Sequence, residues 1–573
     1  MKVLIIGLDG ASLDLLLPWV ESGHLPGFAR LVEEGGFGVL ESVPNQRSAA
    51  AWTSFQTGKN PGKHGIFEFY DRVQDTYDIE FVNARTRDGK SFFKIASEAG
   101  KCVVVVNVPM TYPAEEVKGA MLAGLDAPGK KSKGFSHPPE LIDDLEAQIG
   151  EYIIEPGVIG RIVNGEEDKA VSLLFEEIES KKRASHHLMK EYPWDLFVTV
   201  FRSTDAAHHG FWKYHDTHHP HYSRSEAEKY GDVILDTYKK IDVFVEEALD
   251  NIDTAETMVL VVSDHGCGPK HPASNQINLW LESQGFLAYG GKQAWSANVF
   301  TRLLAGIYSW TVAKTPRRTK EYLWRVFPDL RGRAQSRLCF SGIDWNRTRA
   351  FSDTLLPNIS INVRGREPLG IVDRGEEYDR ICGEITKALL DCRDEVSGEP
   401  IVDKVLHREV TYTGPYVDKA PDLLIRWRED IPISGIRIPQ RHDARSAAET
   451  DRAGRPFIPG EDYRFISGDH RLNGILLFRN SGKRAGRCAL KKASLMDIAP
   501  TVLHALGLPI PDDMDGGVLT ELFDDSYLRS HPVRYIRSES RTRSAAAPSD
   551  GRDYTAEEAE KVKERLRGLG YLE

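Results

Sequence analysis

The sequence predicts an α/β fold with a central sheet covered by helices, because strand-like apolar runs alternate with helical patterns. Four runs have the length of a strand and carry no charge: 3–8, 103–108, 196–201 and 258–262. Such runs indicate strands buried on both faces, as in a parallel sheet. Helical patterns lie between them, one ending at Gly35-Gly36 and another over 230–249. This alternation is typical of an α/β layer sandwich.

Length and charge limit the domain organisation and the partners. At 573 residues the chain exceeds one ordinary core, so a large domain with insertions, or two domains, is expected. A formal net charge of −11 argues against nucleic-acid binding as the main role, since phosphate contacts need a positive field.

Cysteine usage and the first residues bear on the compartment. Six scattered cysteines, without a CxxC pair, suit a reducing environment. The opening MKVLIIGLDG is apolar over too short a run for a signal segment and fits a buried strand better. No stretch reaches about 18 consecutive apolar residues, the length of a membrane span. These features predict a cytoplasmic location.

Changes of composition divide the chain into five expected segments. A sheet domain covers 1–289, an α+β insertion or cap covers 290–450, and the sheet domain resumes over 451–535. A flexible linker rich in Ser, Arg and Ala follows over 536–553, and a C-terminal helix occupies 554–573.

Two of these segments carry patterns of their own. Residues 302–337 hold nine Lys or Arg against two acids, with aromatic residues interleaved. A solvated helical insertion is favoured there over an anion-attracting cap or a peripheral membrane contact. Residues 358–363 alternate like a half-exposed strand. In the last segment, Thr555 and Glu558 predict a capping box, followed by one apolar stripe of Val562, Leu566 and Leu569.

Carboxylates and imidazoles follow the predicted strands. Asp9, Asp205 and Asp264 come after three of the apolar runs, and ligands of open α/β sheets bind at the carboxyl ends of strands. The candidate set is completed by His209, His265 and His470. Carboxylate and imidazole without thiolate suit Zn²⁺, or Mn²⁺, better than copper or iron–sulfur chemistry. Asp205 and His209 share one face of a helical turn, although His208 is an alternative ligand.

Two cations about 3.5 to 4 Å apart would clamp a phosphoryl group during in-line displacement and activate a hydroxyl nucleophile. The sequence offers Ser48, Thr53 and Ser54 as that nucleophile, and position alone does not choose among them. The next segment, Gly58 to His64, resembles a phosphate-binding P-loop. It has three residues between its glycines instead of four, and His64 where Ser or Thr belongs, so a Walker loop is rejected.

Five motifs in this order resemble the alkaline phosphatase superfamily: LDG at Asp9, SAAAWTSFQTGKNPGKHGI, DAAHH, SDHG and GDH. They are most similar to its type I phosphodiesterase and nucleotide pyrophosphatase branch, with its bacterial predicted phosphohydrolases and phosphomutases. RGREPLGIV, APDLLIRW, SLMDIAPTVLHALGLP and LRGLGYLE extend the resemblance over nearly the whole chain. It implies an alkaline phosphatase-like three-layer sandwich with a central, mostly parallel sheet and an inserted α+β cap.

The resemblance also implies roles for residues. Ser48 takes the position of the family's nucleophile, ten residues before Gly58, which favours it over Thr53. His209 is likewise favoured over His208. The implied ligands of one ion are Asp9, Ser48, Asp264 and His265, and those of the other are Asp205, His209 and His470.

One position departs from the pattern of the branch. Phosphodiesterases of this branch often carry an Asn three residues after the nucleophile, which steadies a phosphate oxygen, and this chain has Ala51 there. Stabilisation of that oxygen is expected from a backbone N–H, from Lys270 or from His271. Sulfatases share the fold class but need a CxPxR-type context, and residues 48–52 have neither the Pro nor the Arg.

The sequence thus predicts a phosphoester hydrolase, either a phosphodiesterase or a phosphomonoesterase. Its expected cofactors are two divalent metal ions, zinc or else manganese, and its expected intermediate is a phosphoserine. A phosphomutase or a phosphoryl or head-group transferase on the same site is the alternative. A non-catalytic member of the fold is disfavoured because every ligand type is present. The expected partner is a small phosphorylated substrate.

Overall fold

A computed structural model describes residues 1–73, 76, 79–290, 343–352, 357–438, 466–480, 488–538 and 554–569. The basic stretch 302–337 and most of the expected linker, 539–553, lie outside the described residues. Among the helices that are described, none combines the length and the apolar composition that crossing a membrane requires.

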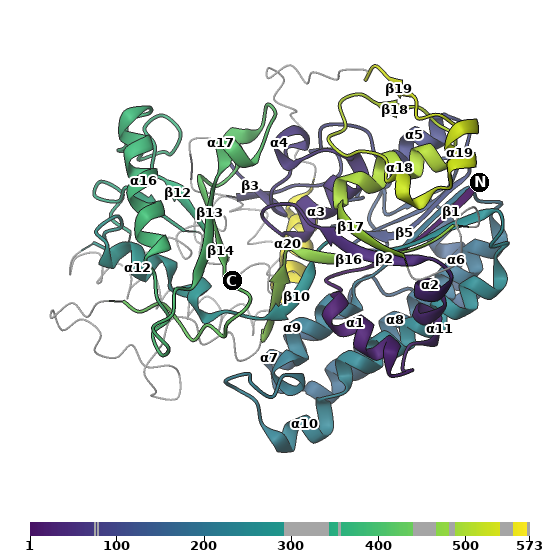
Figure 1. The fold of residues 1–573 in the computed structure, drawn as a ribbon, viewed down its shortest axis with the longest axis horizontal. Helices are drawn as coiled ribbons and strands as arrows, with labels where there is room; N and C mark the ends of the chain where they lie inside the picture. Colours follow the sequence, from purple (N-terminus) through teal and green to yellow (C-terminus); the bar gives the residue numbers. More distant parts are fainter. Residues whose placement is uncertain are drawn as a thin grey trace.

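Nine strands form one sheet in the larger part of the molecule (Figure 1). Their spatial order is β17 (Cys488–Ser494), β2 (Gly36–Glu41), β16 (Asn473–Arg479), β9 (Thr257–Val262), β1 (Lys2–Leu8), β8 (Leu196–Phe201), β5 (Val103–Val108), β6 (Gly119–Ala123) and β7 (Ser136–His137). Strand β16 is antiparallel to both its neighbours, β7 is antiparallel to β6, and the other pairs are parallel. The predicted mostly parallel central sheet is confirmed.

Strand β1 shows why the apolar runs are continuous. It lies between β8 and β9, parallel to both, with Val3 opposite Leu196 on one side and Met258 on the other. Its residues alternate between two apolar cores. Leu4 and Ile6 enter the first core, and Val3 and Ile5 enter the second. Both faces are therefore buried, and no polar residue interrupts the strand.

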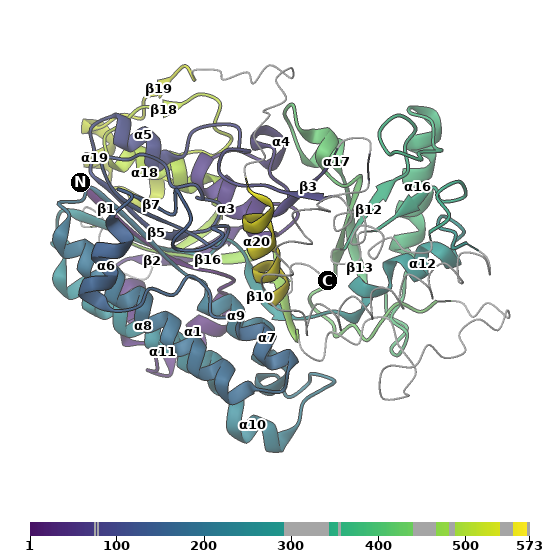
Figure 2. The same cartoon turned by 180° about the vertical axis from the view of Figure 1, so that it is seen from behind.

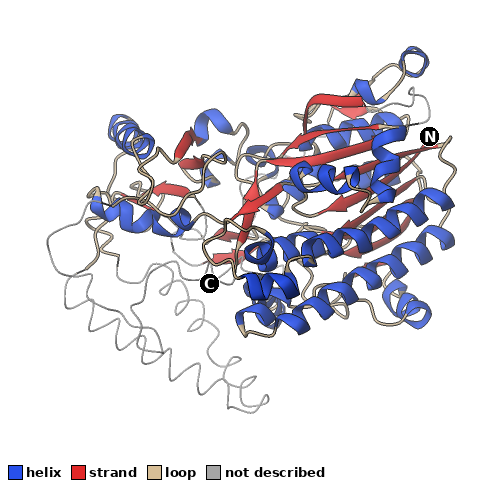
Figure 3. Cartoon of the chain, turned by 60° about the horizontal axis from the view of Figure 1, so that its bottom comes forward, coloured by secondary structure: helices blue, strands red, loops and turns tan. Residues whose placement is uncertain are grey.

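Helices cover both faces of the sheet and give three layers (Figure 3). One layer contains α2 (Pro26–Glu34), α8 (Glu167–Glu191), α9 (Ser203–His215) and α11 (Val233–Asn251), which pack on the first core. The opposite layer contains α3 (Ser48–Thr57), α5 (Phe92–Glu98) and α18 (Ile498–Ala505), which pack on the second. The alkaline phosphatase-like three-layer sandwich is confirmed in this arrangement.

The helix predicted over 230–249 is confirmed as α11 (Val233–Asn251), which starts three residues later than predicted. Helix α10 (Arg224–Tyr230) ends where the predicted helix begins, and α11 starts at Val233. The Gly231 N–H donates to the Ala227 carbonyl and caps α10. The periodic pattern therefore continues across a helix boundary that only Gly231 marks in the sequence.

A smaller antiparallel sheet lies beside the main one (Figure 1). Its order is β11 (Ala350–Phe351), β12 (Asn358–Ile361), β14 (Leu423–Trp427) and β13 (Val402–His407). With α12 (Ile277–Ser283) and α16 (Glu376–Leu390) it encloses a separate apolar core. This region overlaps the expected insertion of 290–450, but its core already includes Ala273 because α12 and the turn before it pack there.

The half-exposed strand expected at 358–363 is instead buried on both faces. Ile359 and Ile361 enter the separate core, as the pattern predicts. The polar face is covered because Ser360 turns toward the main domain, where Arg72 lies 3.4 Å from its hydroxyl. The expectation of an exposed face was wrong, since packing between two parts of the chain leaves no trace in the alternation.

Helix α20 (Ala556–Gly568) docks on the main domain beside α7 (Val158–Val163; Figure 2). The predicted capping box is present, because Thr555 N–H donates to Glu558 Oε2 at 2.9 Å and Glu558 N–H to Thr555 Oγ1 at 3.2 Å. The predicted stripe is buried in the first core, with Leu566 only 1% exposed. The helix is therefore part of the core and not an appendage.

Replacing Leu566 with alanine is expected to lower the free energy of unfolding by about 2–5 kcal/mol, through lost apolar burial and the cavity left behind. Chemical denaturation measures this change. Lys561→Ala, at an exposed position of the same helix, is the control and is expected to cost less than about 0.5 kcal/mol. Equal stability of the Leu566 variant and the parent would show that α20 is not integral to the core.

Candidate metal centre

Parallel strands place three carboxylates at one edge of the sheet. Asp9 follows β1 directly, and Asp264 lies two residues after β9. Asp205 lies in the first turn of α9, which begins two residues after β8. Because β1 has β8 and β9 as its neighbours, these three acids from distant parts of the sequence converge.

His470 reaches the same point through a separate strand pair. Strands β10 (Gly266–Pro269) and β15 (Gly468–Arg471) are antiparallel, with Cys267 opposite His470. This register stacks the rings of His265 and His470, with centroids 3.7 Å apart and planes 20° from parallel. The ring of His209, from α9, has its centroid 5.1 Å from that of His470.

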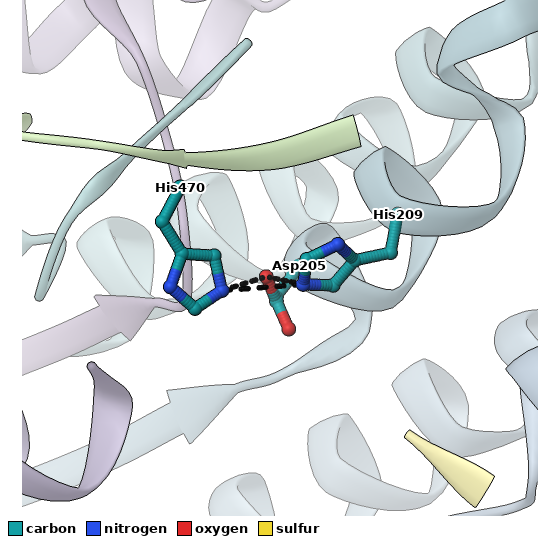
Figure 4. A group of neighbouring side chains, drawn as sticks. All are labelled: Asp205, His209 and His470. Carbon is teal, nitrogen blue, oxygen red and sulfur yellow. Dashed lines mark hydrogen bonds and ion pairs between the residues drawn. The ribbon is translucent and has the colours of Figure 1, made fainter. Parts of the chain in front are cut away.

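The first group of candidate ligands is Asp205, His209 and His470 (Figure 4). Asp205 Oδ1 lies 3.1 Å from His209 Nε2 and 3.6 Å from His470 Nε2. The two Nε2 atoms are 3.2 Å apart. Ligand atoms held about 2.0–2.1 Å from a tetrahedral ion are separated by about 3.3 Å, so this triangle has the size of one face of a metal site.

The second group is Asp9, Asp205 and His265, with Asp264 and Ser48 beside it. Here His265 Nε2 is the common atom. It lies 3.5 Å from Asp9 Oδ1, 3.4 Å from Asp264 Oδ2 and 3.2 Å from Ser48 Oγ. These separations again match the edges of a tetrahedral site. Asp205 belongs to both groups and links them.

All three histidines direct the same ring nitrogen into the cluster. His209 Nδ1 lies 2.8 Å from the Gly468 carbonyl, His265 Nδ1 2.9 Å from the Gly266 carbonyl, and His470 Nδ1 2.7 Å from the Gln46 carbonyl. A carbonyl only accepts, so each Nδ1 carries a proton, and each Nε2 is the ring nitrogen that would offer its lone pair to a bound metal ion. Backbone acceptors of this kind hold histidines that bind metals.

The carboxylates are short of positive charge. Asp9 Oδ1 and Asp264 Oδ2 are buried, and neither has a hydrogen-bond partner among the residues that the structure describes. Burial raises the pKa of Asp9 to about 7, and the Asp205 charge adds to the rise. Burial, together with the charges of Asp9 and Asp205, raises the pKa of Asp264 well above its usual range. Bound cations would satisfy these oxygens, so the residues fit a centre for divalent metal ions.

Two further residues contact this cluster that sequence reasoning did not select. Arg202 is buried and lies 3.4 Å from Asp9 Oδ2 and 3.3 Å from Asp205 Oδ2. Trp52 Nε1–H donates to the same Asp9 oxygen at 3.2 Å. These donors leave the opposite oxygens, Asp9 Oδ1 and Asp205 Oδ1, to face the histidines. Arg202 follows the apolar run of β8 directly, and this place at the end of a buried strand is the feature of the sequence that could have identified it.

The structure separates the residues that the sequence left as alternatives. His208 turns away from the cluster toward Tyr238, whose hydroxyl lies 3.4 Å from its Nε2. Thr53 donates to the Ala49 carbonyl inside α3, and Ser54 Oγ lies 2.9 Å from His64 Nε2. Ser48 and His209 are thus the members of their sets that contact the other candidate ligands.

Lys270 and His271 follow β10 close to this centre. The His271 ring accepts a hydrogen bond from Arg471 at 3.1 Å, and burial lowers its pKa to about 3. The Lys270 charge helps to hold the pKa of the buried Asp469 below its usual range against the effect of burial. No contact within the described part of the chain joins either side chain to Ser48.

The start of α3 supplies another set of donors. Ser48 is its first residue, and the first backbone bond of the helix runs from Ala51 N–H to the Arg47 carbonyl. The N–H groups of Ser48, Ala49 and Ala50 therefore precede the intrahelical ladder and have no acceptor within it. A helix start of this kind attracts phosphate oxygens.

Comparison with known proteins places the fold and the family. A model of the type I phosphodiesterase / nucleotide pyrophosphatase family matches residues 3–435. Phosphonoacetate hydrolase from Sinorhizobium meliloti 1021, solved with phosphonoacetate, shares 15% identity at a TM-score of 0.50, over 88% of this chain and 96% of that one. Human ectonucleotide pyrophosphatase / phosphodiesterase 5 shares 11% identity at a TM-score of 0.44, over 93% and 99%. No curated protein sequence matches the chain.

The first of these structures shows a shared fold, and the family match covers well over half of the chain. The resemblance stated from the motifs is confirmed. The chain belongs to the type I phosphodiesterase / nucleotide pyrophosphatase family, and it is a phosphoric ester hydrolase.

Proposed function

We propose that the chain is a metal-dependent phosphodiesterase that uses Ser48 as its nucleophile and passes through a phosphoserine. One divalent ion is assigned to Asp9, Ser48, Asp264 and His265, and the other to Asp205, His209 and His470, with Asp205 also within reach of the first ion. Zinc is the favoured metal and manganese the alternative, because the set holds nitrogen and carboxylate donors without thiolate.

One observation carries this proposal: the ligand-to-ligand distances around His265 Nε2 include Ser48 Oγ. That hydroxyl lies 3.2 Å from the nitrogen, close to the 3.5 Å and 3.4 Å that separate the nitrogen from Asp9 Oδ1 and Asp264 Oδ2. Ser48 Oγ therefore lies at a ligand-to-ligand distance from a nitrogen that Asp9 and Asp264 also approach. The hydroxyl is therefore supported both as a ligand and as the reacting group.

The residues of the chain divide the reaction among them. Ser48 Oγ forms a bond to phosphorus as the ester oxygen leaves, and water later breaks that bond and frees the serine. The N–H groups at the start of α3 face the phosphoryl oxygens, in the place of the side-chain amide that Ala51 lacks. Arg202 holds Asp9 and Asp205 in position. Two bound cations would supply the charge neutralisation that an in-line displacement requires.

We take a small phosphodiester or pyrophosphate as the substrate, because the family model carries those two activities in its description. A phosphomonoester fits the same donors and is the comparison to make. We also propose that the protein works in the cytoplasm, which the described cysteines support: Cys102, Cys267, Cys382 and Cys392 are free thiols.

Stripping the metal is expected to abolish turnover. Dialysis against a chelator should remove two equivalents per chain and reduce hydrolysis of both a mono- and a diester to background, because the clustered carboxylates would then repel the phosphoryl group. Adding back Zn²⁺ or Mn²⁺ should restore the rate. Elemental analysis before and after, on the same samples as the rates, checks both statements.

The rates on the monoester and the diester, taken together with the metal content, decide between the proposed function and its alternatives. A higher rate on the diester supports the phosphodiesterase, and a higher rate on the monoester transfers the proposal to phosphomonoesters. Undiminished hydrolysis in protein shown to be metal-free would contradict metal dependence itself. Two bound metals without hydrolysis of either substrate would contradict the catalytic proposal.

A further inference from the structure

A pocket lies beside the metal centre, between the main domain and the smaller sheet. Gln46, His271 and His470 line it from the main domain, and Asn358 and Arg426 line it from β12 and β14. His470 also belongs to the metal centre, with its Nε2 toward Asp205. A substrate whose phosphoryl group lies at the centre would therefore extend its remaining part along this wall.

Three arginines line the pocket, and two of them have partners. Arg47 Nε lies 2.6 Å from Glu68 Oε1, and Arg471 donates to the His470 carbonyl at 2.9 Å. Arg426 has neither an ion pair nor a side-chain hydrogen bond to any residue that the structure describes. Burial lowers the pKa of Arg426, so its guanidinium is poorly hydrated as well.

The charge of Glu429 acts on Arg426 from a distance, but no acid that the structure describes forms an ion pair or a hydrogen bond with it. Glu429 faces Arg471, with 4.0 Å between carboxylate and guanidinium. The buried Asp469 lies close to Lys270, whose charge lowers its pKa against the effect of burial. Arg426 therefore lines the pocket without a close acidic partner among the described residues.

The position of Arg426 is fixed by its strand. It pairs with Lys404 of β13 in register, and the next residue, Trp427, is held by a 3.0 Å hydrogen bond from its Nε1–H to Ser274 Oγ. A partly buried arginine without a close acidic partner is unfavourable, and an anion that binds beside it offsets that cost. A planar guanidinium in a fixed place suits a carboxylate or phosphate in particular.

We propose that Arg426 binds a second anionic group of the substrate, a carboxylate or a further phosphate, beyond the reacting phosphorus. The inference rests on the proposed function only in assuming that the phosphoryl group of the substrate lies at the metal centre. It makes the natural substrate a phosphoester with at least two acidic groups and makes Arg426 a determinant of specificity, outside the metal centre.

Binding of unreactive probes tests this assignment without turnover. The metal-loaded full chain is titrated in a calorimeter with alkylphosphonates of two to five methylene groups, whose far end is a methyl, a carboxylate or a second phosphonate. For at least one chain length, an acidic end is expected to strengthen binding roughly 10- to 100-fold over the methyl end, the range of a charged hydrogen bond. The carboxylate and phosphonate series identify which acid fits.

Variants at Arg426 must remove that preference. Arg426→Gln is expected to bind all three series equally, and Arg426→Lys to keep part of the preference, which gives a second reading if the glutamine variant misfolds. Lys404→Gln is the matched control, because Lys404 lies opposite Arg426 in register but is 65% exposed. Equal binding of acidic and methyl probes by the parent, or a preference that survives in Arg426→Gln, would overturn the inference.

Hydrolysis of 4-nitrophenyl diesters with the same three end groups separates this inference from the proposed function. If the parent hydrolyses none of them, the proposed phosphodiesterase fails while the binding result stands. If it hydrolyses all, the loss in Arg426→Gln should fall on the acidic diesters and leave the methyl diester unchanged. A uniform loss across all three would contradict a role in specificity.

Discussion

Replacing Ser48 with alanine is expected to reduce turnover at least about thousandfold and to leave both metal ions bound. The reason is that Ser48 Oγ is the hydroxyl within 3.2 Å of His265 Nε2, while the remaining donors around that nitrogen, Asp9 and Asp264, are unchanged by the substitution. Rates on a diester and elemental analysis of the same preparation measure the two effects. An acid-quenched reaction should also yield a phosphorylated peptide containing residue 48 from the parent and not from the variant.

Ser54→Ala is the matched control. It removes a buried hydroxyl from the same helix, but that hydroxyl bonds His64 and contacts none of the candidate ligands. Its turnover is expected to stay within a few-fold of the parent, even if its stability falls by about 1 kcal/mol. Full turnover in Ser48→Ala, or a phosphopeptide that lacks residue 48, would remove Ser48 from the mechanism.

The main sheet could be predicted from the sequence where its strands are buried on both faces. Strands β5 and β8 occupy the predicted ranges, and β1 and β9 differ by one residue at their starts. The strands at one edge could not be predicted in this way. Strand β2 alternates buried with more exposed positions, and β17 contains two adjacent lysines, so neither forms an apolar run.

The candidate ligands divide according to what holds them. Asp9 and Asp264 follow buried strands, so the rule of strand ends alone brings them together. His470 has no such signal, because its place depends on the pairing of β10 with β15 across a long separation in sequence. His470 was predicted from the resemblance to the family, because the GDH motif identifies the residue without any knowledge of the strand pairing that places it.

The position of Arg426 in a pocket wall could be predicted neither from hydrophobic periodicity nor from a motif. Arg426 is the one charged residue of β14, which reads Leu-Leu-Ile-Arg-Trp, and it lies between Ile425 and Trp427. Only the packing of the smaller sheet against the main domain turns that face into a pocket wall. The candidate ligands and nucleophile could thus be named from the sequence, whereas the proposed second anion site required the arrangement of the two sheets.

Replacing Asp205 with asparagine is expected to weaken the binding of both metal ions by more than about a hundredfold and to abolish turnover at low metal concentration. Asp205 is the one residue that belongs to both groups of candidate ligands, and the substitution keeps its shape while removing its charge. The fold should persist because Arg202 retains its contact with Asp9 at 3.4 Å. Equilibrium dialysis against metal buffers measures the affinities, and circular dichroism measures the fold.

The two variants differ in their expected metal content, because Ser48→Ala should keep both ions and Asp205→Asn should lose affinity for both. Comparing the pair therefore separates loss of the nucleophile from loss of the metal ions. Asp242→Asn is the control, since Asp242 is a buried acid that accepts from the N–H groups of Gly27 and Phe28, away from the metal centre. It should keep both ions and its turnover. If Asp205→Asn lost one ion and bound the other with parental affinity, Asp205 would belong to a single site, and the two groups would not share a ligand. If it retained both, the centre would be held by the histidines, Asp9 and Asp264 alone.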